Sequence, residues 1–328
     1  MIFQYVRRTL TTLFFFLSIL MTITTAQGAV REYWIAAEKM PWNYAPSGKN
    51  LIHEEDGLNV WGQTLVYTKY RYIGYTDGSY KKPIEQPEWM GILGPQLRAV
   101  VGDTLKVHFL NKTDHPLSMH PHGVLYDKDN EGADGGKGAS ILPGKSYTYT
   151  WIADENAGPG PNDPSSIVWL YHSHVMSDDE TSLGLIGTIV VTRAGSQSSE
   201  SNPKPQDVDH EFTALFLIFN EENDEESGMK HTINGRIFGN LPGYNTYVGE
   251  RVRWHLIALG NEQDNHSIHW HGQTVLHHGR RTDVIELMPA SMTTADMVPR
   301  SAGNWLFHCH VDDHMTAGMS TRWQVKSR

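Results

Sequence analysis

Histidines gathered in a few short groups are the residues of this chain with the clearest chemical use. Of the 18 histidines, ten fall in four groups, namely His120-Pro-His122, His172-Ser-His174, His266 with His269 and His271, and His308-Cys309-His310 with His314. A single H-x-H pair is ordinary on an exposed strand, but packing does not explain four such groups. Neutral imidazole is a good ligand for copper, and the imidazoles of four H-x-H pairs suit a cluster of about three copper ions.

The spacing within these groups indicates two different copper sites. Successive side chains of a strand point to opposite faces, so both histidines of an H-x-H pair share one face. By the same rule, Cys309 faces away from His308 and His310 and belongs to a second site. The residues that can complete this second site are His266, His314 and Met319. The blue-copper site that transfers electrons consists of two histidines, one cysteine and an axial methionine. Cys309 is the direct chain neighbour of His308 and His310, so one residue of backbone connects this site to the cluster.

The chain repeats one unit. Residues 92–123 and 237–272 each contain a Gly-acid turn, an alternating strand and an H-x-H-G motif, and each is followed later by a second H-x-H. Such self-similarity indicates a tandem duplication. In the first repeat Leu117 stands in the position of His266, and Ser173 stands in that of Cys309. We therefore expect one blue copper per chain and a cluster built from both repeats, within one chain or between chains.

The elements that must position these residues are strands. Glycine and proline are plentiful, long helical periodicity is scarce, and the stretch VGDTLKVHFL alternates apolar and polar residues as a half-buried strand does. The 328 residues suffice for two domains. A Ser-, Pro- and Asn-rich linker at 195–209 places these domains at about 30–194 and 208–328.

The first residues predict export. Residues 1–28 combine an early arginine pair, a short apolar run and small residues near Ala29, which is the pattern of a cleaved signal peptide. We expect a periplasmic or secreted protein with no membrane span in the mature chain. The only cysteine, Cys309, cannot form an internal disulfide, and a metal bond would protect it from oxidation. The formal net charge of −10 argues against nucleic acid as a partner.

The motifs HPHG, HSHV, HSIHWHG and HCHVDDHMTAGM resemble the four copper-binding motifs of multicopper oxidases. Their arrangement is similar to the two-domain multicopper oxidases of the small laccase type, and INGRIFGNLPG in the second half is similar to ceruloplasmin-type domains. This resemblance implies an all-β chain of two tandem cupredoxin-like Greek-key β-sandwich domains. It further implies that only the second domain holds a type 1 copper, with the three-copper cluster between domain 1 and domain 2.

The resemblance also implies a role for each ligand. The implied sets are His266, Cys309, His314 and Met319 for type 1, His120 and His269 for type 2, and His122, His172, His174, His271, His308 and His310 for the type 3 pair. This gives about four copper ions per chain, with electrons passing from Cys309 to His308 and His310. Two-domain relatives form homotrimers in which each cluster lies between subunits, so a homotrimer is the implied assembly.

The implied reaction is one-electron oxidation of a donor coupled to four-electron reduction of O2 to water. We expect a laccase-like enzyme that takes phenols or similar donors, with a ferroxidase or cuprous oxidase of metal homeostasis as the alternative. Asp283 in RTDVIELMP and Glu221 in LIFNEENDEES match iron-binding positions of ceruloplasmin, although the histidine expected near Glu221 is missing. If these residues bind iron, replacing both by alanine should lower Fe(II) turnover and spare phenol turnover.

Oxygen reduction also consumes protons, and a carboxylate near the cluster can relay them. Asp114 precedes HPHG and Asp264 precedes HSIHWHG, so both are candidates. Two rival functions fit the motifs less well. A copper nitrite reductase would keep its blue site in the first domain, where this chain has lost it. A copper carrier or store would leave the H-x-H pairs unexplained.

Overall fold

The computed structural model describes residues 28–58, 64–175, 182–221, 228–261 and 263–328. The predicted export signal at 1–28 therefore lies outside the described residues except for Gly28. Strands dominate the described chain, which confirms the predicted all-β class. None of its described helices has the length and apolar character needed to cross a membrane.

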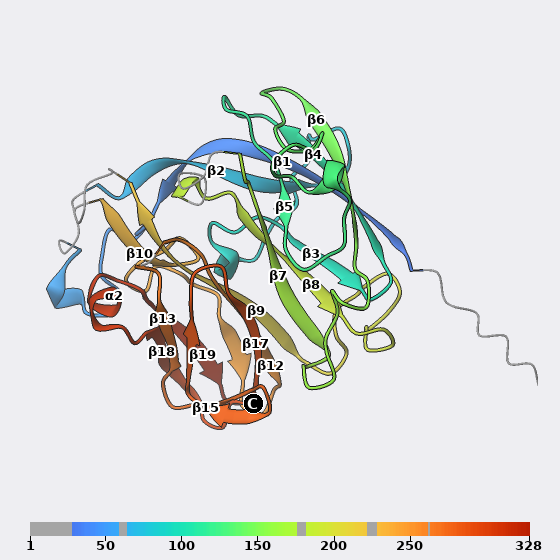
Figure 1. The fold of residues 1–328 in the computed structure, drawn as a ribbon. Coiled ribbons are helices and arrows are strands. Elements are labelled where there is room, and N and C mark those ends of the chain that lie inside the picture. The colour runs from blue at the N-terminus through green and yellow to red at the C-terminus, as the bar shows by residue number, and fades with distance from the viewer. Residues whose placement is uncertain (1–27, 59–63, 176–181, 222–227, 262) are drawn as a thin grey trace, which may run out of the picture.

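The first half of the chain folds into two sheets with Greek-key-like strand orders (Figure 1). One sheet has the order β2 (Val66–Tyr75), β1 (Val30–Asn43), β4 (Thr104–Asn111) and β6 (Ser146–Ile152). The other has the order β3 (Gln96–Val100), β8 (Ile186–Thr192), β7 (Ser166–His172) and β5 (His120–Pro121). Buried side chains of both sheets, including Phe109 and Tyr171, form one core between them.

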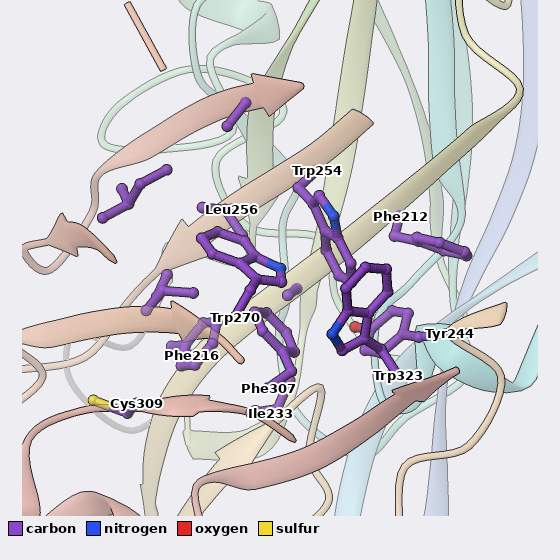
Figure 2. Close-up of a cluster of buried hydrophobic side chains, with 14 of the residues drawn as sticks. Phe212, Phe216, Ile233, Tyr244, Trp254, Leu256, Trp270, Phe307, Cys309 and Trp323 are labelled. Atoms are coloured by element: carbon purple, nitrogen blue, oxygen red, sulfur yellow. The ribbon is translucent and has the colours of Figure 1, made fainter. Parts of the chain in front are cut away.

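The second half repeats this plan with longer sheets. The first has the order β10 (Met229–Ile233), β9 (His210–Asn220), β12 (Val252–Ala258), β17 (Met292–Met297), β14 (Val275–His277) and β15 (Arg280–Thr282). The second has the order β11 (Asn245–Tyr247), β19 (Ser320–Lys326), β18 (Gly303–Cys309), β13 (His266–Trp270) and β16 (Val284–Leu287). Figure 2 shows the aromatic core between them, with Trp254, Trp270 and Phe307 at its centre and Cys309 at one edge.

The two halves share a buried apolar layer. The outer face of the β7–β8 sheet packs against the outer face of the β9–β12 sheet through residues such as Leu170, Val190, Leu217 and Ile257. Both sheets are therefore covered on two sides. This explains why every residue of β8 and β12 is buried, whereas β4 alternates buried and half-buried positions as its sequence predicts. The chain is a stack of four sheets.

Short helical turns connect the strands. The α-helix α2 (Asp312–Thr316) follows β18, and single 3-10 turns occupy η1 (Glu54–Asp56), η2 (Glu88–Met90) and η3 (Lys128–Asn130). Between the end of β8 at Thr192 and the start of β9 at His210 there is no helix or strand. The segment 195–209, predicted as a linker, lies within this connection.

Candidate metal centres

Strand pairing brings the first-half histidines together. In the antiparallel pair of β5 and β7, His120 lies directly opposite His172. Ring nitrogens of His120, His122 and His172 lie within 4.8 Å of one another. The ring of His174 lies 5.2 Å from that of His120. These four residues, the first-half histidine group, form one set of imidazoles that face each other.

The second half repeats this geometry strand for strand. In the pair of β13 and β18, His269 lies opposite His308. Ring nitrogens of His269, His271 and His308 lie within 4.8 Å of one another, and the His310 ring lies 5.4 Å from that of His308. These four residues are the second-half histidine group.

The hydrogen bonds of these histidines direct their free nitrogens at each other. The Nδ1 atoms of His172 and His308 lie 2.8 and 2.7 Å from the carbonyl oxygens of Ser173 and Cys309, so these Nδ1 atoms donate and each Nε2 keeps a lone pair. These Nε2 atoms lie 3.2 and 3.1 Å from a second histidine Nε2, in His122 and His271 respectively. A shared cation is the natural partner for nitrogens arranged in this way, so the donor set fits copper.

Two backbone carbonyls orient the first histidine of each H-x-H-G motif. His120 Nδ1 donates to the carbonyl of Glu131 at 2.7 Å, and His269 Nδ1 donates to that of Asp283 at 2.9 Å. Such bonds fix the tautomer and leave Nε2 for the metal. The sequence does not single out Glu131, because any residue can supply a carbonyl and only the fold brings that loop to His120.

Cys309 belongs to a separate cluster on the other face of β18. Its Sγ lies 3.8 Å from His266 Nδ1 and 3.6 Å from His314 Nδ1, and these two nitrogens lie 3.2 Å apart. The three side chains, the Cys309 cluster, are buried. The backbone N–H of Ser267 donates to the sulfur at 3.4 Å, which favours the thiolate that a metal requires.

Met319, the expected axial residue, is fully buried in the same core as Cys309. Its backbone carbonyl accepts the Cys309 N–H at 3.0 Å, and its N–H donates to the His314 carbonyl at 2.9 Å. The chain thus brings Met319 back beside the cluster. His231 of β10, which the sequence does not distinguish from an ordinary strand histidine, packs its ring 5.0 Å from that of His314.

The first half keeps the backbone of this cluster without its ligands. Ser173 Oγ accepts the N–H of Ser118 at 3.0 Å, which repeats the bond from Ser267 to Cys309. Leu117 is fully buried in the position of His266. An oxygen and an apolar side chain give a transition metal no usable pair of soft ligands there.

The carboxylates singled out in the sequence occupy four different environments. Glu221 is half-buried, forms an ion pair with Lys69 and accepts a hydrogen bond from Tyr44. Asp283 is exposed and lies beside His269 through its carbonyl. Asp114 binds Lys39 at 2.8 Å and the hydroxyl of Tyr70 at 2.5 Å.

Asp264 lies at the Cys309 cluster. It is buried, it accepts the backbone N–H groups of Ile218 and Asn261, and one of its oxygens is 3.4 Å from His266 Nε2. This contact is too bent to count as a hydrogen bond, but it places the carboxylate where it favours a proton on Nε2 and a lone pair on Nδ1. Asp264 and Asp114 stay predictions as proton relays.

Burial favours the neutral form of several histidines in the candidate metal sites. It lowers the pKa of His172 to about 3 and the pKa values of His122, His308 and His314 to about 4, with neighbouring histidines adding to each shift. Neutral rings are ready to bind metal at physiological pH.

The same shifts predict acid sensitivity of the copper-free protein. A histidine with a depressed pKa binds protons better when unfolded, so its stabilising effect is complete above about pH 6.5 and is lost toward about pH 4. We expect the melting temperature of copper-free protein to fall across this window, before most carboxylates titrate. Replacing His172 by glutamine should reduce the slope in a pH series of thermal melts. A flat melting temperature between pH 6.5 and 4.5 would contradict the buried neutral histidines.

The two histidine groups do not meet within one chain. Among the described residues, no group of close metal-ligating atoms combines histidines of the first half with histidines of the second. In Figure 1, β5 and β13 lie in separate parts of the fold. Each group offers only half of the imidazoles expected for a three-copper cluster.

Comparison with known proteins matches both halves to one family. Family models described as multicopper oxidase match residues 90–196 and 207–328. Hephaestin from Homo sapiens is 38% identical over 92% of this chain, and the Mus musculus protein named Ferroxidase HEPHL1 is 38% identical over 91% of it. The chain spans only 30% and 29% of the lengths of these two relatives.

A solved structure described as a multicopper oxidase has the same fold. It superposes with a TM-score of 0.65 at 23% identity, covering 90% of this chain and 89% of that one. This confirms the predicted cupredoxin-like sandwiches.

Proposed function

Because the chain belongs to the multicopper oxidase family, we propose that it couples one-electron oxidation of a small donor at a type 1 copper to four-electron reduction of O2 to water at a three-copper cluster. The observation that carries this proposal is the arrangement on β18. Cys309 points into one candidate metal site while its neighbour His308 points into another. About four copper ions per chain would occupy these sites, with the ligand roles expected from the motifs.

The chain's own residues support this division of labour. The Cys309 cluster is closed to water, and the Ser267 N–H stabilises the thiolate against the rise in pKa that burial causes. Within each of the two groups, histidines hold their lone pairs toward one another. The peptide between Cys309 and His308 is a short covalent route for electrons between the two sites.

We propose a homotrimer in which the cluster lies between subunits. The first-half histidine group of one copy would face the second-half group of its neighbour, since each group alone is incomplete. Copies related by a rotation that closes can satisfy every group in a ring.

For the donor, two classes are in question. The resemblance to small laccases favours phenol-like donors, whereas a relative carries the name ferroxidase. Exposed carboxylates of α2, Asp312 and Asp313, lie next to His314. Burial lowers the pKa of this histidine most strongly, and the charges of Asp264 and, after it, Asp313 act in the opposite direction. We propose that a metal ion such as Fe(II) binds the carboxylate oxygens of α2, which are hard ligands that favour its oxidised product. Glu221 is already neutralised by Lys69 and is a poor iron ligand.

Replacing Asp313 by asparagine separates the two donor classes. Copper-loaded protein should consume O2 with Fe(II) at about one O2 per four donors, and the variant should lower kcat/KM for Fe(II) by about tenfold because the local negative charge is lost. Turnover of a neutral phenol should stay within about twofold.

Two further variants control this measurement. Asp77→Asn removes an exposed carboxylate of the first half and should leave the turnover of both donors unchanged. Asp283→Asn tests the position expected from the motifs, and a loss confined to this variant would move the iron site there. Equal loss for both donors in Asp313→Asn would contradict a metal-ion site on α2.

We also propose that the mature protein is exported, to the periplasm or outside the cell. The signal-like segment 1–28 supports this location.

A further inference from the structure

A pocket of about 490 Å³ lies at the junction of the two halves, away from the histidine groups. Trp42 at the end of β1, Arg71 of β2 and Arg236 just after β10 line it. Ile73 and Ile84 supply apolar walls, and a loop containing Gln86 and Glu88 forms another side.

Two guanidinium groups share one aromatic ring in this pocket. The Cζ atom of Arg236 lies 3.8 Å from the centre of the Trp42 ring, and that of Arg71 lies 5.9 Å from it. The indole is fixed because its N–H donates to the carbonyl of Gly235 at 2.6 Å. Arg71 is fixed by the carbonyl of Leu93 at 3.0 Å and by Gln86 at 2.9 Å. Arg236 donates to the carbonyl of Asn43.

These two cations have no carboxylate partner within the described parts of the chain. Neither arginine forms an ion pair there, whereas Arg253, buried in the same junction, binds Asp296 at 2.7 Å. Burial, followed by the repulsion of Arg71, lowers the pKa of Arg236 to about 10. Two half-buried like charges destabilise the folded chain unless an anion neutralises them.

We propose that this pocket binds a small organic anion whose carboxylate or phosphate group lies between Arg71 and Arg236. Planar guanidinium groups bind both oxyanions through paired hydrogen bonds, and Nη1 of Arg71 and Nη2 of Arg236 make no hydrogen bond within the described residues. The isoleucine walls and the indole would contact the carbon skeleton. Glu88, exposed at the rim, weakens the binding of an anion by its like charge.

The ligand would also join the two halves of the chain. Arg71 belongs to the first-half sheet and Arg236 to the second half, so an anion held by both connects them. A ligand that binds only the folded state raises the melting temperature. The site is independent of the oxidase reaction proposed above.

Titration calorimetry and thermal melts with citrate, and separately with inorganic phosphate, test the site in the full chain. Chloride at equal ionic strength corrects for general salt effects. We expect Arg236→Gln to weaken binding by about 10- to 100-fold, the loss typical of charge-assisted hydrogen bonds. Glu88→Gln should strengthen binding by about two- to fivefold because it removes an exposed like charge. Arg280→Gln, an exposed arginine of β15, is the matched control and should change nothing.

The outcomes distinguish the explanations. Binding of citrate but not phosphate assigns the site to carboxylates, and the reverse assigns it to phosphates. Equal binding by wild type, Arg236→Gln and Arg280→Gln would overturn the proposal, since only a general ionic effect would then remain. If Arg236→Gln does not fold, unchanged affinity in Glu88→Gln, or no measurable binding by wild type, would overturn it in the same way.

Discussion

Cys309→Ser should abolish the intense blue absorption of the copper-loaded protein and lower O2 consumption with any donor by about a thousandfold or more, equivalent to about 4 kcal/mol in the barrier. The reason is that serine replaces the only thiolate, in a site where His266 and His314 lie 3.8 and 3.6 Å from the sulfur. Visible and EPR spectra, together with copper analysis, check the loss of the type 1 site. The variant should keep the coupled copper pair, because His308 faces the other site.

The first half provides a matched control for this variant. Ser173 occupies the equivalent backbone position and accepts the equivalent hydrogen bond. Ser173→Ala should leave the blue absorption unchanged, although the unpaired Ser118 N–H lowers stability by about 1–3 kcal/mol. A blue band that survives in Cys309→Ser would contradict the assignment of the type 1 site.

Mixing two inactive variants should restore activity if the cluster lies between subunits. His172→Ala disables the first-half histidine group and His271→Ala disables the second, and each alone should reduce O2 consumption by about a thousandfold. In trimers assembled from an equal mixture, a His271→Ala first half meets a His172→Ala second half at about a quarter of the interfaces. Those interfaces contain eight intact histidines, so we expect about a quarter of wild-type activity.

Native mass spectrometry should confirm mixed trimers, and the two variants measured before mixing are the controls. Mixed trimers without recovered activity would contradict a cluster shared between chains. The result does not depend on the donor, so it tests the assembly separately from the ferroxidase hypothesis.

Residues close in sequence were predictable, and contacts across the fold were not. Alternation along β18 places Cys309 and His308 on opposite faces, and it follows from the strand period alone. The alternation of β4 was equally visible. The continuous burial of β8 and β12 was not, because it arises from the layer between the two halves.

The carboxylates also show that contacts across the fold could not be predicted from the sequence. Glu221 matched an iron-binding position by sequence, but Lys69, a residue of β2, neutralises it in the fold. Against the dominant effect of burial, Asp264 and then Asp313 raise the pKa of His314, so these carboxylates rather than Glu221 act on the Cys309 cluster. The ion pair of Lys69 and Glu221 joins residues more than a hundred positions apart, so no local sequence pattern could have revealed it.

The buried apolar layer between the two halves also fixes the angle between them. Side chains of β7 and β8 pack closely against those of β9 and β12, so the two halves behave as one rigid body. In the proposed trimer, the rotation that relates one copy to its neighbour would then be set by the fold of each monomer. In the proposed trimer, a substitution such as Leu217→Ala, remote from every predicted ligand, would change this angle and keep the ring from closing, so copper binding would then depend on residues that never contact metal.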